Sequence, residues 1–367
     1  MSYIEKTSFM YIGKSVKIVV EVKCPSFCAV LRVKSKLYAD EFNLAEPYDR
    51  KTHVFTVPVR ELKKDTVLSF SARILHKRGI KISRSFPYGM PVYAEKEKLL
   101  DEYDNRLKEI SRESEEVCEG VIYRHILYEN KNGAPVHAFI TEFDPEKAEL
   151  YIGTPGDGYK SRRVKATIPE MINAAENNSI NIVSAVNADF FDMFGDGHPS
   201  GLCVKNGRVV ANANSDRPFI ALKKDGSHVI TSLKESPDIL PCLSHAAAGM
   251  QLVLKDGEIF DYAPLEPFSY TPHPRTCAGI RRDGTVILLV VDGRIPDYSN
   301  GASLVDLALL MKSYGADRAL NMDGGGSSAM YTKKDGAHIL HSRPADLVKP
   351  TANLIRKDYN SLLVKKK

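Results

Sequence analysis

Short apolar runs, rich in β-branched residues and partly alternating with polar ones, fill the N-terminal quarter of the chain. They occur at residues 16–22, 28–33, 52–57 and 66–72. This alternation predicts β-strands, and their spacing favours a small sandwich. We therefore expect a small all-β, sandwich-like accessory domain over residues 1–92. No cluster of catalytic residue types occurs in it, so we expect it to bind a polymer or another subunit.

Residues 93–118 follow a different pattern, with many charges and apolar side chains at helical spacing. The apolar positions are Leu99, Leu100, Tyr103, Leu107 and Ile110. On a helix they would form one apolar stripe opposite a charged face. The pattern predicts an amphipathic linker helix that packs on one of the two domains.

The remaining residues, 119–367, alternate apolar runs with Asn-Gly and Asp-Gly pairs. Four such pairs predict β-hairpins, at residues 205–208, 224–227, 255–258 and 282–285. Two helices interrupt the pattern, at residues 168–175 and 303–311. The second begins at a Ser303 cap, with Asp306 three positions on, and ends near Gly315. We expect an α+β domain with a hairpin-rich mixed β-sheet and few helices.

Composition restricts the class of protein. A chain of 367 residues suits two domains, and 43% hydrophobic with 26% charged residues excludes a disordered chain. The net charge of +5 is mild and the lysines form no basic stripe, so no nucleic-acid partner is expected. The six cysteines are expected to be reduced, and Cys24 and Cys28 lack a second pair at zinc-ligand spacing. No metal or other cofactor is expected.

Targeting signals are equally sparse. No apolar run is long enough to span a bilayer. The first residues lack the basic-then-apolar order of a signal peptide. As written, the sequence is expected to act in the cytoplasm, or to leave the cell by lysis or within a virion.

Residues 319–330 carry the clearest chemical signal. An apolar run ends at Asn321 and Asp323, and a glycine triplet (Gly324, Gly325, Gly326) and two serines follow. Folds accept the entropic cost of such glycines where the backbone takes positive φ or where a ligand approaches the main chain. Successive N–H groups in such a turn can form an anion-binding nest. The alternative is a tight hairpin turn capped by Asp323.

Four further polar clusters lie at the ends of apolar runs, at residues 187–192, 197–201, 273–276 and 291–294. They supply the carboxylates of Asp189 and Asp292 and the guanidinium groups of Arg275 and Arg294. Arginine forks match phosphate oxygens, and paired carboxylates suit acid–base cleavage of an anomeric bond. We expect these groups to converge on Asp323.

In their order along the chain, these segments resemble the phosphodiester glycosidase family. The resemblance runs from about residue 120 to residue 360, and its most specific part is the glycine triplet with the preceding helix. The segments that carry it are residues 186–191, 199–201, 252–257, 274–279, 291–294 and 319–328. It implies a hydrolase that cleaves a sugar-1-phosphodiester, such as an N-acetylglucosamine-1-phosphodiester, to the free sugar and a phosphomonoester.

The resemblance also implies roles for individual residues. The implied catalytic residues are Asp323, Asp292 and Asn187. The implied substrate and phosphate ligands are Arg275, Arg294, Asn321, Gly324, Gly325, Gly326 and Ser327, with Asp189 beside them. Two positions depart from the family pattern. Asp189 stands where the family usually has Gly, and Lys349 stands where it tends to have Arg, which leaves a second phosphate contact open.

Two other functions are compatible with the sequence. One is a non-catalytic protein that binds carbohydrate or cell wall, and the other is a metal-dependent phosphodiesterase. Retention of both Asp292 and Asp323 favours an enzyme over a binding protein. The scattered histidines disfavour a metal-dependent enzyme. No lysine follows the glycines as in a P-loop, which excludes that nucleotide site.

Overall fold

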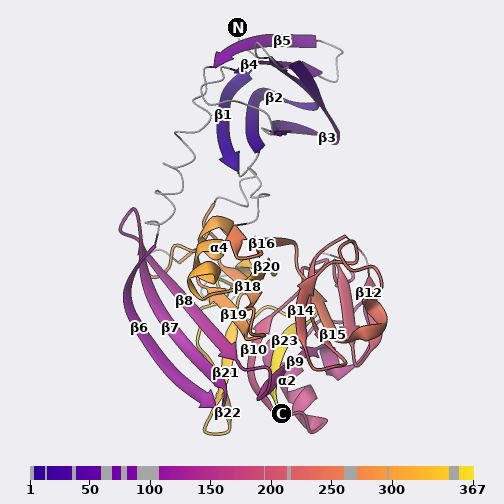
Figure 1. The fold of residues 1–367 in the computed structure, drawn as a ribbon, viewed down its shortest axis with the longest axis vertical. Helices are drawn as coiled ribbons and strands as arrows, with labels where there is room; N and C mark the ends of the chain where they lie inside the picture. Colours follow the sequence, from indigo (N-terminus) through magenta and orange to yellow (C-terminus); the bar gives the residue numbers. More distant parts are fainter. Residues whose placement is uncertain are drawn as a thin grey trace. The chain divides into compact units, whose positions relative to one another are not determined.

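The computed structural model describes residues 107–367 with their side chains, apart from residues 194, 213–215, 260–270, 296 and 347–354. Between residues 4 and 88 it describes the backbone of five strands (Figure 1). The chain divides into two units, residues 1–104 with 261–270 and residues 105–260 with 271–367. None of the described helices has the length and apolar character that a membrane span requires.

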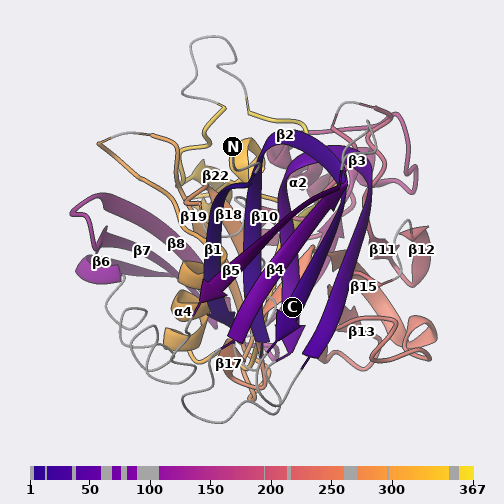
Figure 2. The same cartoon turned by 90° about the horizontal axis from the view of Figure 1, so that it is seen from above.

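The N-terminal strands form one antiparallel sheet (Figure 2). They are β1 (Ile4–Ile12), β2 (Ser15–Lys34), β3 (Ala39–Pro58), β4 (Leu68–Leu75) and β5 (Lys81–Tyr88). The first half of β2 pairs with β1 and the second half with β4, while β3 pairs with both halves. The runs expected at residues 16–22 and 28–33 thus belong to one long strand. The sandwich-like packing stays a prediction.

The linker helix expected over residues 93–118 is wrong for its second half. Residues 107–118 form strand β6 (Leu107–Cys118), and residues 93–106 lie outside the described part of the chain. β6 pairs along its whole length with β7 (Val121–Asn130), so it belongs to the C-terminal unit, which begins before the expected boundary at residue 119. This pairing outweighs the local helical spacing of Leu107 and Ile110. The charges and two register shifts of β6 are typical of a protected edge strand.

Three sheets build the C-terminal unit (Figure 1). The eight-stranded sheet has the order β17 (Glu258–Ile259), β16 (Gln251–Lys255), β20 (Arg318–Asn321), β18 (Arg275–Ile280), β19 (Val286–Val291), β8 (Pro135–Phe143), β7 and β6. One five-stranded sheet has the order β22 (Ala337–Leu340), β21 (Met330–Lys334), β10 (Ile182–Asn187), β23 (Ser361–Lys366) and β9 (Ala148–Gly153). The other has the order β12 (Arg208–Asn212), β11 (Leu202–Lys205), β15 (Leu243–Ala248), β13 (Phe219–Lys223) and β14 (His228–Thr231).

All pairings among these strands are antiparallel, so the expectation of a mixed sheet is wrong. Tight hairpins can join only antiparallel neighbours, and the four predicted hairpins are confirmed as β11–β12, β13–β14, β16–β17 and β18–β19. Asn206 and Gly207 both take positive φ, 48° and 74°, as the primed hairpin turn requires.

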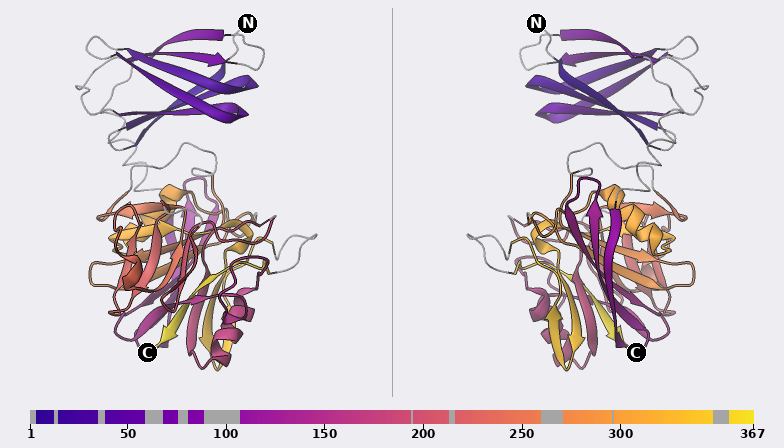
Figure 3. Two further views of the ribbon diagram at one scale, coloured as in Figure 1. Left: turned by 90° about the vertical axis from the view of Figure 1, so that its right-hand side faces the viewer. Right: turned by 90° about the vertical axis from the view of Figure 1, so that its left-hand side faces the viewer.

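The two predicted helices are also confirmed, as α2 (Ile168–Asn177) and α4 (Leu304–Ser313). Ser303 and Asp306 form a reciprocal capping box at the start of α4, with bonds of 3.1 and 2.8 Å. α4 lies on one face of the eight-stranded sheet, against β16, β17, β18 and β20 (Figure 3), and its Leu307 and Met311 side chains belong to the buried core there. Three single-turn 3₁₀ helices complete the described elements: η1 (Pro155–Asp157), η2 (Leu240–Cys242) and η3 (Gly325–Ser327).

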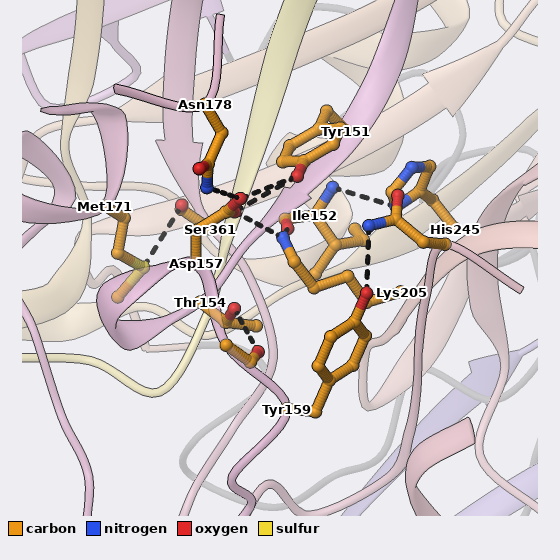
Figure 4. Close-up of polar contacts among 12 residues, drawn as sticks. Tyr151, Ile152, Thr154, Asp157, Tyr159, Met171, Asn178, Lys205, His245 and Ser361 are labelled. Atoms are coloured by element: carbon orange, nitrogen blue, oxygen red, sulfur yellow. Dashed lines mark hydrogen bonds and ion pairs between the residues drawn. The ribbon is translucent and has the colours of Figure 1, made fainter. Parts of the chain in front are cut away.

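A buried ion pair links the two five-stranded sheets (Figure 4). Lys205 of β11 lies in one sheet, and Asp157 belongs to η1, which follows β9 of the other. The Lys205 Nζ atom donates to Asp157 Oδ1 at 2.6 Å and to the main-chain oxygen of Ile152 at 2.5 Å. Asp157 also accepts hydrogen bonds from the Tyr151 hydroxyl and the Asn178 amide. Because both charges have several partners, the pair fixes the two sheets without leaving a buried charge unsatisfied.

Candidate active site

The candidate residues lie where the ends of strands of the eight-stranded sheet meet the ends of strands of the sheet that contains β10. Asn187, the last residue of β10, pairs with Ser361, the first residue of β23. Its side chain reaches across to Thr276 of β18 and to the main chain of Asp323. Strand ends of both sheets therefore meet here, and the residues that follow or precede them share one site. These residues are Asn187, Asp189, Arg275, Asp292, Arg294, Asn321, Asp323, Ser327 and Asp358.

The glycine turn forms η3 directly after β20. Three of its N–H groups bond within the protein: Gly324 N–H to Asp323 Oδ1 (2.8 Å), Gly325 N–H to Pro274 O (2.9 Å) and Ser327 N–H to Gly324 O (3.3 Å). Of the N–H groups of the triplet, only that of Gly326 has no acceptor in the described part of the chain. The triplet therefore does not present the expected set of converging free N–H groups, and Gly326 is itself buried.

Close neighbours explain the three glycines. Gly325 has φ +65°, and a Cβ there would lie 3.1 Å from Arg294 Nη1. A Cβ on Gly324 would lie 2.7 Å from the Pro274 oxygen, and one on Gly326 would overlap the Asp346 carboxylate and the Arg356 guanidinium. The turn is thus enclosed by two arginines, Arg294 and Arg356. Because these cations lie against the main chain, a side chain in the turn would displace them.

Asp323 lies between two other carboxyl groups. Burial raises its pKa to about 6, opposed by the Ser327 hydroxyl, the Gly324 N–H and the positive charge of Arg356. The pKa values of Asp189 and Asp358 are raised far above normal by burial and also by the charge of Asp323. The three carboxyl groups therefore form one electrostatic cluster.

Asp189 occupies a buried position in this cluster. Its Oδ2 atom accepts the Gly201 N–H at 3.0 Å, and its Oδ1 atom is buried without a hydrogen-bond partner. Arg217 opposes the rise in its pKa. The structure thus adds a carboxyl group beside Asp323 at this position, as the sequence allowed.

Asp292, the residue directly after β19, has hydrogen-bond partners of its own. Its Oδ2 atom accepts the Arg343 N–H at 2.7 Å and the Tyr298 hydroxyl at 3.1 Å, and its Oδ1 atom is buried without a partner. Burial raises its pKa to about 7, opposed by Arg343 and Tyr298. The negative charge of Asp323 raises the pKa of Asp189 and that of Asp358.

The two expected phosphate-binding arginines differ. Arg275 is buried, and its Nε atom donates to Ala302 O at 3.1 Å and its Nη2 atom to Thr271 O at 3.4 Å. Burial and the charge of Arg294 lower its pKa to about 10. Arg294 is exposed, and its Nη2 atom lies 3.3 Å from His273 Nδ1 and beside the glycine turn. Arg294 is therefore placed to meet a ligand, while Arg275 anchors two loops.

The two asparagines also differ. The Asn187 amide donates to Asp323 O at 2.7 Å and accepts from the Thr276 hydroxyl at 2.6 Å and the Ala329 N–H at 3.3 Å. It holds the glycine turn against β10 and β18. The Asn321 amide is fully buried, and both its nitrogen and its oxygen lack a hydrogen-bond partner.

Three site residues were not expected from the sequence: Arg217, Arg356 and Asp358. Arg356 bonds to the Asp346 carboxylate and to the Ser327 hydroxyl, and Ser327 in turn donates to Asp358 Oδ1 at 2.8 Å. The sequence feature that could have indicated Arg356 and Asp358 is the polar run of residues 356–360, directly before the apolar residues of β23. The described residues contain no group of three or more His, Cys, Asp or Glu side chains suited to a metal ion.

Comparison with known proteins connects this site to a family. The sequence pattern of the phosphodiester glycosidases matches residues 181–364, which is half of the 367-residue chain. The catalytic domain of zebrafish N-acetylglucosamine-1-phosphodiester alpha-N-acetylglucosaminidase, auto-inhibited by its pro-peptide, has a similar fold, with a TM-score of 0.56 and 20% identity. That similarity covers 70% of this chain and 89% of the zebrafish chain.

A curated relative adds a shorter match. The SPbeta prophage-derived uncharacterized protein YomE of Bacillus subtilis (strain 168) is 42% identical over 67 residues, which are 18% of this chain. The matched stretch spans only 10% of that relative's length. The family match, in contrast, includes Asn187, Arg275, Asp292 and the glycine turn with Asp323. The chain belongs to the phosphodiester glycosidase family.

Proposed function

We propose that this protein hydrolyses a sugar-1-phosphodiester, of the N-acetylglucosamine-1-phosphodiester kind, to the free sugar and a phosphomonoester. Family membership supports a phosphodiester glycosidase. The zebrafish protein of similar fold is named for this class of substrate. The observation that carries the proposal is the position of Asp323, at a glycine turn that Arg294 and Arg356 enclose.

The parts of the site suit the parts of such a substrate. The guanidinium groups of Arg294 and Arg356, which lie against the glycine turn, would bind the phosphate oxygens. Asp323, with a pKa of about 6, is ionised at neutral pH and would act as base or nucleophile toward the anomeric carbon. Cleavage would break the bond between C1 and its oxygen, and the phosphomonoester would leave. Asn187 would hold the turn in place.

The experiment is a screen of soluble sugar-1-phosphodiesters that scores free sugar against sugar phosphate. Asp323→Asn keeps the shape of the side chain and removes its charge, so turnover should fall by roughly 10²-fold or more in a folded protein. The matched control is Asp238→Asn, an exposed aspartate in the loop before η2, which should retain full activity.

Three outcomes would contradict the proposal. Full activity of Asp323→Asn would place the chemistry elsewhere. Tight binding of glycans without turnover would favour a carbohydrate-binding protein. Release of sugar phosphate, abolished by a chelator and restored by a metal ion, would favour a metal-dependent phosphodiesterase.

A further inference from the structure

Asp358 is a buried carboxyl group without a bonded cation. Its side chain is 3% exposed, and its main chain is fixed on both sides by hydrogen bonds of 3.0 and 2.9 Å to Ala166. The nearby cation is Arg356, whose Nε and Nη2 atoms both bond to Asp346 rather than to Asp358. In the described part of the chain, no ion pair includes Asp358. A buried carboxylate in such surroundings is costly, and the group lowers that cost by keeping its proton.

The Ser327 hydroxyl of the glycine turn contacts Asp358. It donates to Asp358 Oδ1 at 2.8 Å, and its oxygen accepts from Arg356 Nη1 at 3.4 Å. The groups that face Asp358 come from several elements: Asp323 and Ser327 from the glycine turn, Tyr331 from β21, Asp346 after β22, and Arg356 on its own segment. The negative charges of Asp323 and Asp346 both raise the pKa of Asp358 and so favour its protonated form.

We propose that Asp358 is a positioning residue: as a neutral carboxylic acid near the Asp323 carboxylate, it accepts the Ser327 hydroxyl hydrogen and so holds the glycine turn in place. An anionic phosphodiester then meets the negative charge of Asp323 without a second one from Asp358. Ionisation of Asp358 would add a charge next to the phosphate position and weaken substrate binding. This role rests on the proposed function, because it assumes an anionic substrate at the glycine turn.

Asp358→Asn tests the proposal because an amide resembles a protonated carboxyl group. The amide oxygen can accept the Ser327 hydrogen, and the amide nitrogen takes the place of the acid O–H. At pH 7 the variant should change kcat/KM by less than about tenfold, well below the ~10²–10⁴-fold effect of losing a catalytic acid or base. The rise of KM at alkaline pH should be weaker in the variant. A folded variant that is inactive at pH 7, or that keeps the alkaline rise unchanged, would overturn the proposal.

Infrared spectroscopy provides a readout that does not depend on any substrate. The wild type at pH 7 should show the carbonyl band of protonated carboxyl groups, and Asp358→Asn should reduce it, whereas Asp238→Asn should not. If Asp358→Asn does not fold, the Asp189→Asn, Asp292→Asn double variant replaces it, because it removes two further carboxyl groups whose pKa is raised by burial, and a protonated-carboxyl band must remain in that variant. Absence of the band there, or an unchanged band in folded Asp358→Asn, would overturn the proposal. If the band behaves as expected but no phosphodiester is cleaved, the proposed function fails and the protonation state of Asp358 stands.

Discussion

The Asn187 side-chain amide donates a hydrogen bond to the main-chain oxygen of Asp323, 2.7 Å away and 136 residues along the chain. The same amide accepts hydrogen bonds from Thr276 and Ala329. One side chain thus holds together β10, β18 and both ends of the glycine turn. This makes Asn187 a positioning residue for Asp323.

Asn187→Ala should lower both stability and turnover. The substitution leaves several buried polar groups unsatisfied, and each such loss costs about 1–3 kcal/mol. The glycine turn loses its anchor, so kcat should fall more than KM rises. Thermal unfolding and steady-state kinetics measure the two effects. Asn173→Ala, an exposed position of α2, is the control and should leave both unchanged. Unchanged turnover in Asn187→Ala would show that Asp323 keeps its position without the bond.

Arg294 and Arg275 should respond differently to substitution by lysine. Arg294→Lys keeps the charge but loses the fork, so kcat/KM should fall about tenfold or more, the scale of one lost charged hydrogen bond, with an unchanged Tm. Arg275→Lys removes hydrogen bonds to Ala302 and Thr271, so its main effect should be a lower Tm. Equal kinetic defects with unchanged stability in both variants would instead mean that Arg275 also contacts the phosphate.

Gly326→Ala should disturb the Asp346–Arg356 ion pair. The added methyl group would overlap both side chains, and overpacking of this kind costs about 1–3 kcal/mol. Displacement of Arg356 should raise KM for an anionic substrate. Gly158→Ala is the matched control, because its Cβ would meet only the Pro155 oxygen, at 3.6 Å. The free energy of unfolding and KM are measured for both variants. Equal values for Gly326→Ala and Gly158→Ala would contradict the crowded geometry at Gly326.

Asp292→Asn should stabilise the protein at alkaline pH. The pKa of Asp292 is raised to about 7, against about 4 in an unfolded chain. The folded state therefore holds its proton more tightly, and the stability this provides, present below pH 4, is lost as pH rises through 7. Asparagine does not ionise and should avoid this loss, which amounts to a few kcal/mol at most (~1.4 kcal/mol per pKa unit). Calorimetry should show a larger Tm advantage of the variant at pH 8 than at pH 5. An equal Tm difference at both pH values would contradict a raised pKa.

Local features made much of the fold predictable. Asn-Gly and Asp-Gly pairs specify hairpins within four residues, and the Ser303–Asp306 box specifies the start of α4. β6 was not predictable in this way. The spacing of Leu107 and Ile110 suits a helix, and only the pairing with β7 makes this segment a strand.

The site shows the same division. Asp323 and its glycines stand in one short motif, so they could be proposed as site residues from the sequence alone. Asp358 and Arg356 reach them only because β23 pairs with β10, which brings residues more than 170 positions apart together, as in the bond from Asp189 N–H to Asn360 Oδ1. The interaction of Asp323 with Asp189 and Asp358 was also not predictable. The charge of Asp323 raises the pKa of both buried carboxyl groups, and no spacing in the sequence indicates that these three residues lie near one another.

The position of bond cleavage tests the central claim most directly. A sugar-1-phosphodiester is hydrolysed by the enzyme in ¹⁸O-labelled water, and the products are analysed by mass spectrometry. Attack at the anomeric carbon, with Asp323 beside it, predicts that the label appears on the released sugar and that the phosphomonoester carries none. Label on the phosphomonoester would show that the P–O bond breaks, and would contradict a glycosidase mechanism at this site.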